Sequence, residues 1–208
     1  RNGHLCKALV ATSASYAAND RPLRAAPLVS LLQRMCNAAA GSPMPAAYLP
    51  MVMEELNFDG TDAKTVRWRK PPAGSYLENF LVVVIGAGYS GLAMAAKLKE
   101  AGIPLLLIEK NAGVGGTWLE NSYPGAAVDT PNHFYSYSFR VKTDWNHYFA
   151  KQPDIISYIR TCYGEIGLSE VTRFNEKVVS SIWDPIESRW NMQVRRADGS
   201  HYELKANV

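Results

Sequence analysis

The pattern of apolar and polar positions divides the chain near residue 77. Before that point, apolar side chains recur at helical spacing in two segments, residues 27–35 and 48–56. The pattern therefore predicts a short helical N-terminal extension with a linker over residues 1–76. A separate domain is expected over residues 77–208.

The second part begins with a pattern typical of an α/β fold. Residues 81–85 are a continuous apolar run rich in β-branched side chains, as expected of a parallel strand buried on both faces. A helical pattern follows over residues 92–98, and a second apolar strand over 104–108 ends in Glu109. This order predicts a βαβ unit with a right-handed crossover, the start of a Rossmann-type domain.

The rest of the chain predicts one more helix and a small antiparallel element. Apolar residues recur at helical spacing over residues 153–166. Strand-like alternation follows over 178–183, 190–195 and 202–208. The Asp-Gly pair at 198–199 is a hairpin turn signal between the last two strands.

The turn after the first strand carries a G-x-G-x-x-G fingerprint. Gly86 permits a tight turn, Gly88 lets the backbone approach a pyrophosphate, and Gly91 lets the helix pack closely on the strand. Free N–H groups at the helix N-terminus stabilise the phosphate charge. Glu109 can accept hydrogen bonds from ribose hydroxyls and would repel a 2′-phosphate, so FAD or NAD is expected here rather than NADPH. The alternative is a glycine-rich turn that binds nothing.

A second glycine cluster, G-V-G-G-T-W at residues 113–118, favours FAD over NAD. It lets the backbone pass close to a flat, bulky group such as an isoalloxazine ring. Aromatic residues that would line such a pocket are Trp118, Tyr123, Tyr135, Tyr137 and Phe139. For Tyr137 and Phe139, packing in the core is an equal alternative.

Charge, cysteine spacing and apolar runs limit the kinds of binding partner that are expected. The net charge of +3 is weak and the basic residues do not cluster, so nucleic-acid binding is not expected. Cys6, Cys36 and Cys162 lack zinc spacing, which predicts reduced thiols in a cytoplasmic protein and no metal site. No apolar run is long enough to cross a bilayer, so no membrane partner is expected.

The string G-G-T-W-L-E-N-S-Y-P-G at residues 115–125, followed by Asp129 and by Y-S-Y-S-F at 135–139, resembles the FAD domain of Baeyer–Villiger monooxygenases. The resemblance covers about residues 78–208. It implies bound FAD, NADPH held mainly by a later domain, and conversion of a ketone to an ester or lactone with O2.

The N-terminal extension resembles that of the 4-hydroxyacetophenone monooxygenase subgroup, through L-P-M at residues 49–51 and D-G at 59–60. A homodimer formed through these helices is one possibility. Packing of an amphipathic helix pair on its own domain is an equal alternative.

The resemblance also implies roles for individual residues. The expected cofactor contacts are Gly86, Gly88, Ser90 and Gly91 at the pyrophosphate, Glu109 at the ribose, Lys110 and Val178 near the adenosine, and Gly116, Thr117, Trp118, Tyr123 and Tyr135 on the flavin side. Asp129 corresponds to a catalytic aspartate on the flavin face that orients an arginine. Its alternative role is a loop-capping carboxylate bonded to nearby backbone.

Two departures from the family's pattern matter. Ser122 stands where arginine is usual, which removes a charge beside the flavin loop. The chain ends at Val208 without a second glycine fingerprint or the arginine partner, so we expect an incomplete FAD domain that is inactive alone. Alternative readings are an N- or S-oxygenating flavin monooxygenase and a noncatalytic, truncated flavin-binding domain.

Overall fold

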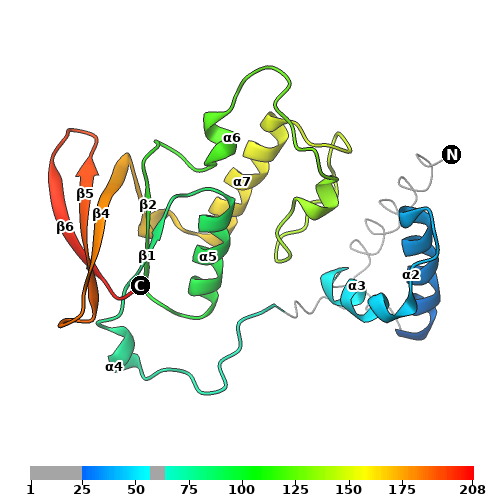
Figure 1. The fold of residues 1–208 in the computed structure, drawn as a ribbon, viewed down its shortest axis with the longest axis horizontal. Helices are drawn as coiled ribbons and strands as arrows, with labels where there is room; N and C mark the ends of the chain where they lie inside the picture. The colour runs from blue at the N-terminus through cyan, green and yellow to red at the C-terminus, as the bar shows by residue number, and fades with distance from the viewer. Residues whose placement is uncertain (1–24, 57–63) are drawn as a thin grey trace. The chain divides into compact units, whose positions relative to one another are not determined.

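The computed structural model describes residues 25–56 and 64–208 (Figure 1). Contacts divide the chain into two compact units, residues 1–64 with 136–144, and residues 65–135 with 145–208. The predicted domain boundary near residue 76 stays a prediction. The D-G pair at 59–60 and the first part of the predicted extension lie outside the described residues.

The first unit contains the two helices expected from the N-terminal pattern, α2 (Ala25–Ala40) and α3 (Leu49–Leu56). A 3₁₀ turn, Ala46–Tyr48, leads into α3. Leu32 of α2 and Leu49 of α3 are buried. The side chain of Asn37 accepts a hydrogen bond from the Met44 backbone N–H at 2.8 Å, which fastens the interhelical turn to α2.

The second unit is built on a parallel sheet of order β1-β2-β3, formed by β1 (Val82–Ile85), β2 (Leu105–Glu109) and β3 (Thr172–Phe174). Helix α5 (Tyr89–Glu100) connects β1 to β2, and α7 (Gln152–Ile166) precedes β3. This arrangement confirms the predicted α/β class. Strand β3 was not predicted from the sequence, because its three residues, one of them a charged arginine, form no apolar run.

The core of this unit lies between the parallel sheet and its two helices. The most deeply buried side chains there are Leu92, Leu107, Ile108, Ile155 and Ile159. Helix α5 packs on β1 and β2 and contacts α7. Each buried residue of this kind contributes about 1.5–3 kcal/mol to folding. This packing fixes the N-terminus of α5 at the end of β1.

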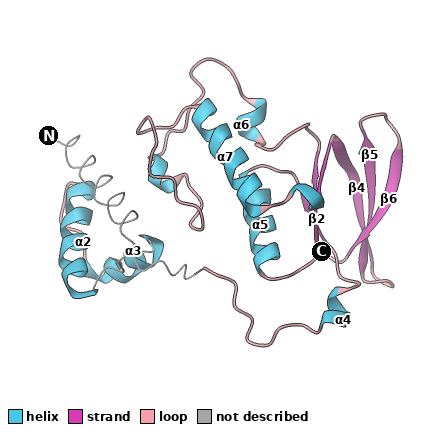
Figure 2. Cartoon of the chain, turned by 180° about the vertical axis from the view of Figure 1, so that it is seen from behind, coloured by secondary structure: helices cyan, strands magenta, loops and turns pink. Residues whose placement is uncertain are grey.

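The predicted antiparallel element is present as a sheet of order β4-β5-β6. Its strands are β4 (Glu176–Asp184), β5 (Arg189–Arg196) and β6 (His201–Ala206). Figure 2 shows the parallel sheet between this sheet and the helices α5 and α7. The carboxylate of Asp198 accepts the Ser200 N–H at 2.8 Å and stabilises the predicted hairpin turn.

The last predicted strand is shorter than expected at its end. It was predicted to reach Val208, but β6 ends at Ala206. The next two residues hydrogen-bond beside β1 instead: the Asn207 N–H donates to the Leu81 carbonyl at 2.9 Å, and the Val83 N–H donates to the Val208 carbonyl at 2.8 Å.

The remaining elements are short. They are α4 (Gly74–Leu77), α6 (Thr117–Glu120) and the 3₁₀ turns Asn132–Phe134 and Ser169–Val171. Of the helices within residues 25–56 and 64–208, none combines the length and apolar character needed to span a bilayer.

Candidate functional site

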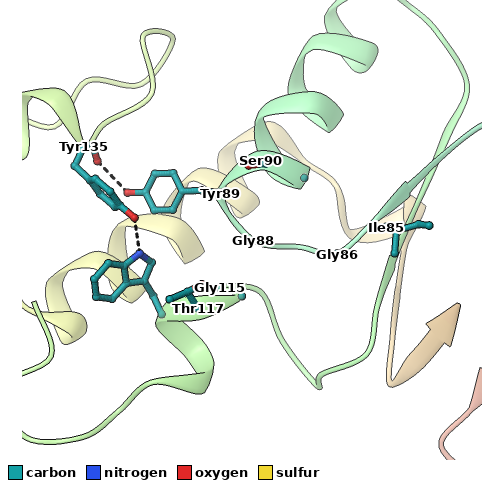
Figure 3. Close-up of a pocket in the computed structure, with 11 residues that line it drawn as sticks. Ile85, Gly86, Gly88, Tyr89, Ser90, Gly115, Thr117 and Tyr135 are labelled. Atoms are coloured by element: carbon teal, nitrogen blue, oxygen red, sulfur yellow. Dashed lines mark hydrogen bonds between the residues drawn. The ribbon is translucent and has the colours of Figure 1, made fainter. Parts of the chain in front are cut away.

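A cavity of about 330 Å³ opens where the two glycine-rich segments meet (Figure 3). Its lining comes from the end of β1, the start of α5, the turn into α6 and one aromatic residue of the following loop. The lining residues are Ile85, Gly86, Gly88, Tyr89, Ser90, Gly91, Gly115, Gly116, Thr117, Trp118 and Tyr135. Eight of these are among the predicted cofactor contacts, and the structure brings them together. Their contact with a cofactor stays a prediction.

The first glycine-rich turn is tightly packed. A Cβ atom at position 91 would lie 1.8 Å from the Gly86 carbonyl oxygen, so only glycine fits there. This confirms the predicted close packing of the helix on the strand. Gly88 is the N-cap of α5 and offers no side-chain cap. The first N–H groups of a helix have no partner within it, so this end of α5 suits an anion.

The second glycine cluster packs against the first. The Gly115 N–H donates to the Ala87 carbonyl at 2.9 Å. A Cβ atom at position 116 would lie 2.9 Å from the Gly88 Cα, and Gly116 has a φ of +53°. Glycine is thus required at position 116 by the protein's own packing. From the sequence, this cluster was expected only to let the backbone approach a ligand.

Three aromatic residues form one wall of the cavity. The Tyr89 hydroxyl donates to the Tyr135 carbonyl at 3.0 Å. The Trp118 Nε1–H donates to the Tyr135 hydroxyl at 2.9 Å, and the two rings meet edge to face (Figure 3). Aromatic faces held in this way can pack against a flat ring.

Glu109 lies at the end of β2 and is only 3% exposed. One carboxylate oxygen accepts the Ala87 N–H at 2.7 Å, and the other accepts the Asn111 N–H at 2.8 Å. Glu109 therefore holds the first glycine-rich turn, a role that the sequence did not reveal. A carboxylate offers about four acceptor positions, so two remain for a ribose. Binding of a ribose stays a prediction.

Lys110 and Val178, expected near the adenosine, are not among the cavity's lining residues. The Lys110 ammonium pairs with the Glu120 carboxylate at 2.9 Å. Hydrogen bonds from Asn111 and then Lys110 hold the pKa of Glu120 below its usual value. The hydrogen bond with Glu120 raises the pKa of Lys110. Val178 pairs with Val194 of β5, next to a bulge.

Tyr123 and Asp129 are exposed and also lie outside the lining of this cavity. Within residues 25–56 and 64–208, no hydrogen bond or ion pair engages the Asp129 carboxylate. The loop-capping alternative therefore finds no support here. Tyr137 is 8% exposed, which fits the alternative that it is packed core, and it stacks on the half-buried Phe139 at 4.8 Å between ring centroids.

The loop that carries Asp129 is fastened to the segment before α7. The Val128 N–H donates to the Ala150 carbonyl at 3.0 Å. The side chain of Asn132, 1% exposed, donates to the His147 carbonyl and accepts the Ala150 N–H. Asn132 was not singled out by the sequence, because its partners are distant along the chain.

Sequence reasoning also left three lining residues out of the predicted contacts, Ile85, Tyr89 and Gly115. Ile85 is the last residue of a predicted strand and Gly115 belongs to the second glycine cluster. Tyr89 occupies a variable position of the fingerprint. An aromatic residue directly after the helix-capping glycine is the signal that could have drawn attention to it.

Residues 84–151 match the family of NAD(P)-binding Rossmann-like domains. A "Baeyer-Villiger monooxygenase" of Pseudomonas aeruginosa is 42% identical over 128 residues, which are 61% of this chain and 24% of that protein. A solved structure, "Oxidized steroid monooxygenase bound to NADP", has 34% identity and a TM-score of 0.54 over 61% of this chain and 24% of that one.

These names support the Baeyer–Villiger monooxygenase family. An "FAD-binding monooxygenase" of Emericella nidulans, 33% identical over 144 residues, covers 66% of this chain and 24% of its own length. The chain thus spans about a quarter of the length of the relatives it matches. The predicted subgroup is not supported by any of these names.

Proposed function

We propose that this chain binds FAD in the cavity between its two glycine-rich segments and forms the FAD-binding part of a Baeyer–Villiger monooxygenase. The whole enzyme would use NADPH and O2 to convert ketones to esters or lactones. The observation that carries the proposal is a single cavity in which the N-terminus of α5 and an aromatic wall lie together.

The donor set suits FAD. The N–H groups of Ser90 and Gly91, in the first turn of α5, would hold the pyrophosphate. Thr117, Trp118 and Tyr135 would lie along the flavin side. NADPH is assigned to another part of the whole enzyme, because the negative charge of Glu109 disfavours a 2′-phosphate. The relatives named for FAD and for NADP support this pair of cofactors.

When bound, FAD would supply the chemistry that activates O2, with NADPH as the source of electrons in the whole enzyme. The chain's own contribution is to hold the cofactor and to keep water from it. We assign Asp129 the orientation of an arginine supplied by the remainder of the enzyme. Its exposed carboxylate, free of hydrogen bonds to the described residues, is available for that pairing.

Finer assignments extend this proposal. We place the protein with the 4-hydroxyacetophenone monooxygenase subgroup in the cytoplasm, with α2 and α3 as a candidate dimer contact. The 208 residues alone are expected to lack NADPH-driven oxygenation, because they span about a quarter of the relatives' length. The alternatives are an enzyme that oxygenates amines or sulfides and a noncatalytic, truncated flavin-binding domain.

The test is an assay of the protein expressed from the whole reading frame that encodes this chain. It is purified with FAD and supplied with NADPH, O2 and either an aryl ketone or a tertiary amine. We expect an ester from the ketone. Oxidation of the amine alone would replace the proposal by the N-oxygenating alternative, and a protein without flavin or NADPH oxidation would support the noncatalytic one.

A further inference from the structure

Tyr89 connects the helix that begins the phosphate site with the loop that carries the aromatic wall. It is the first residue of α5 and follows Gly88 directly. Its hydroxyl donates to the main-chain carbonyl of Tyr135 at 3.0 Å, although the two residues are 46 positions apart. The two rings also meet edge to face, with centroids 4.8 Å apart.

A second hydrogen bond holds Tyr135 at its side-chain hydroxyl. Its hydroxyl accepts the Nε1–H of Trp118 at 2.9 Å. Figure 3 shows Tyr89 of α5 beside Tyr135 of the loop, with a dashed line for the bond between them. The bond from Tyr89 fixes the backbone of Tyr135, and the bond from Trp118 fixes its side chain. Neither bond substitutes for the other.

This arrangement leaves the hydroxyl hydrogen of Tyr135 available. A phenol oxygen can accept a hydrogen bond and still donate its own proton. Among the described residues, no acceptor takes that proton, and Tyr135 lines the cavity. The position of the loop that carries Tyr135 therefore determines the direction of this hydroxyl donor in the cavity.

We propose that Tyr89 is a positioning residue: its hydroxyl fixes the loop of residues 129–135 on the N-terminus of α5 and so presets the aromatic wall of the cavity. A phenylalanine here would keep the ring contacts with Tyr135 and Tyr158 but would lose this bond. Packing alone would require only the ring of Tyr89, whereas its hydroxyl also bonds the loop. The ligand-related part of this inference rests on the proposed binding of FAD.

The test compares Tyr89→Phe with the wild-type chain by two measurements. In the ligand-free chain, amide hydrogen exchange of residues 129–135 should become faster in the variant, while residues 153–166 of α7 keep their rates. The second measurement is a titration of each chain with FAD. The dissociation constant of FAD should be about fivefold higher for Tyr89→Phe than for wild type, as expected for the loss of one net hydrogen bond. The visible circular dichroism of the bound flavin should also change at saturation.

The matched control is Tyr163→Phe, which removes a phenol hydroxyl from α7; the Tyr163 ring contacts the Phe174 ring, not the loop of residues 129–135 or Trp118, in the ring pairs of the described residues. It should leave the exchange of residues 129–135 and the flavin spectrum unchanged. Equal exchange in Tyr89→Phe and wild type would overturn the inference, whether or not FAD binds. A wild-type chain that fails to bind FAD would instead overturn the proposed function, and exchange alone would then decide the role of Tyr89.

Discussion

The two glycine-rich segments of the cavity reach their shapes by different means. The turn from Gly86 to Gly91 joins β1 to α5, and its close backbone packing admits only glycine at position 91, with one further bond from the Glu109 carboxylate. The segment around Gly116 packs on the first turn and is followed by a loop that the Asn132 side chain ties to the distant backbone of His147 and Ala150. The conformation of the second segment therefore depends on the first turn, against which it packs.

Disruption of the first turn should have the largest effect. Gly91→Ala would place a Cβ atom 1.8 Å from the Gly86 carbonyl oxygen, and this backbone neighbour cannot rotate away. We expect a loss of about 3 kcal/mol or more in the free energy of unfolding, measured by urea denaturation.

Gly164→Ala, in α7, is the matched control for this change. A Cβ atom there meets nothing within 4 Å, so it should stabilise the helix by up to about 1 kcal/mol. Equal effects of the two substitutions would show that the first turn tolerates expansion.

Substitution of Asn132, which holds the loop, should lower the free energy of unfolding by less than Gly91→Ala does. Asn132→Leu leaves the His147 carbonyl and the Ala150 N–H without their buried partner. We expect a loss of about 2–3 kcal/mol and faster amide exchange in residues 126–132. Asn121→Ala, which removes only an exposed bond to the Thr117 carbonyl, should cost less than about 1 kcal/mol. A loss in Asn132→Leu no larger than in Asn121→Ala would contradict this account of the loop.

The smallest effect is expected at Glu120, on the exposed side of α6. Its pKa is lowered in the folded chain by Asn111 and Lys110, so its stabilising contribution is present above its unfolded pKa and is lost as the pH falls through the folded value. Glu120→Gln should therefore be slightly less stable than wild type at pH 7 and equally stable once the pH lies well below the folded pKa of Glu120. A stability difference between Glu120→Gln and wild type that grows as the pH falls would contradict a stabilising role of the ionised Glu120 carboxylate.

The same contrast explains what the sequence could predict. The strands and helices around the first turn follow from local periodicity. The fingerprint, the second glycine cluster and the family resemblance together predicted eight lining residues of the cavity. The hydrogen bonds of Asn132 join residues 15 and 18 positions apart, and no local pattern encodes them. Glu109 was predicted only as a ribose acceptor, because its bond to the Ala87 N–H becomes visible only when β2 lies beside β1.

The central claim is that the two segments together form an FAD site. Isothermal titration of the 208-residue chain with FAD, and separately with NADP⁺, tests it most directly. We expect one FAD to bind per chain, more tightly than NADP⁺, because Glu109 opposes a 2′-phosphate. Equal or tighter binding of NADP⁺, or no heat of binding from either dinucleotide to a folded chain, would contradict the account.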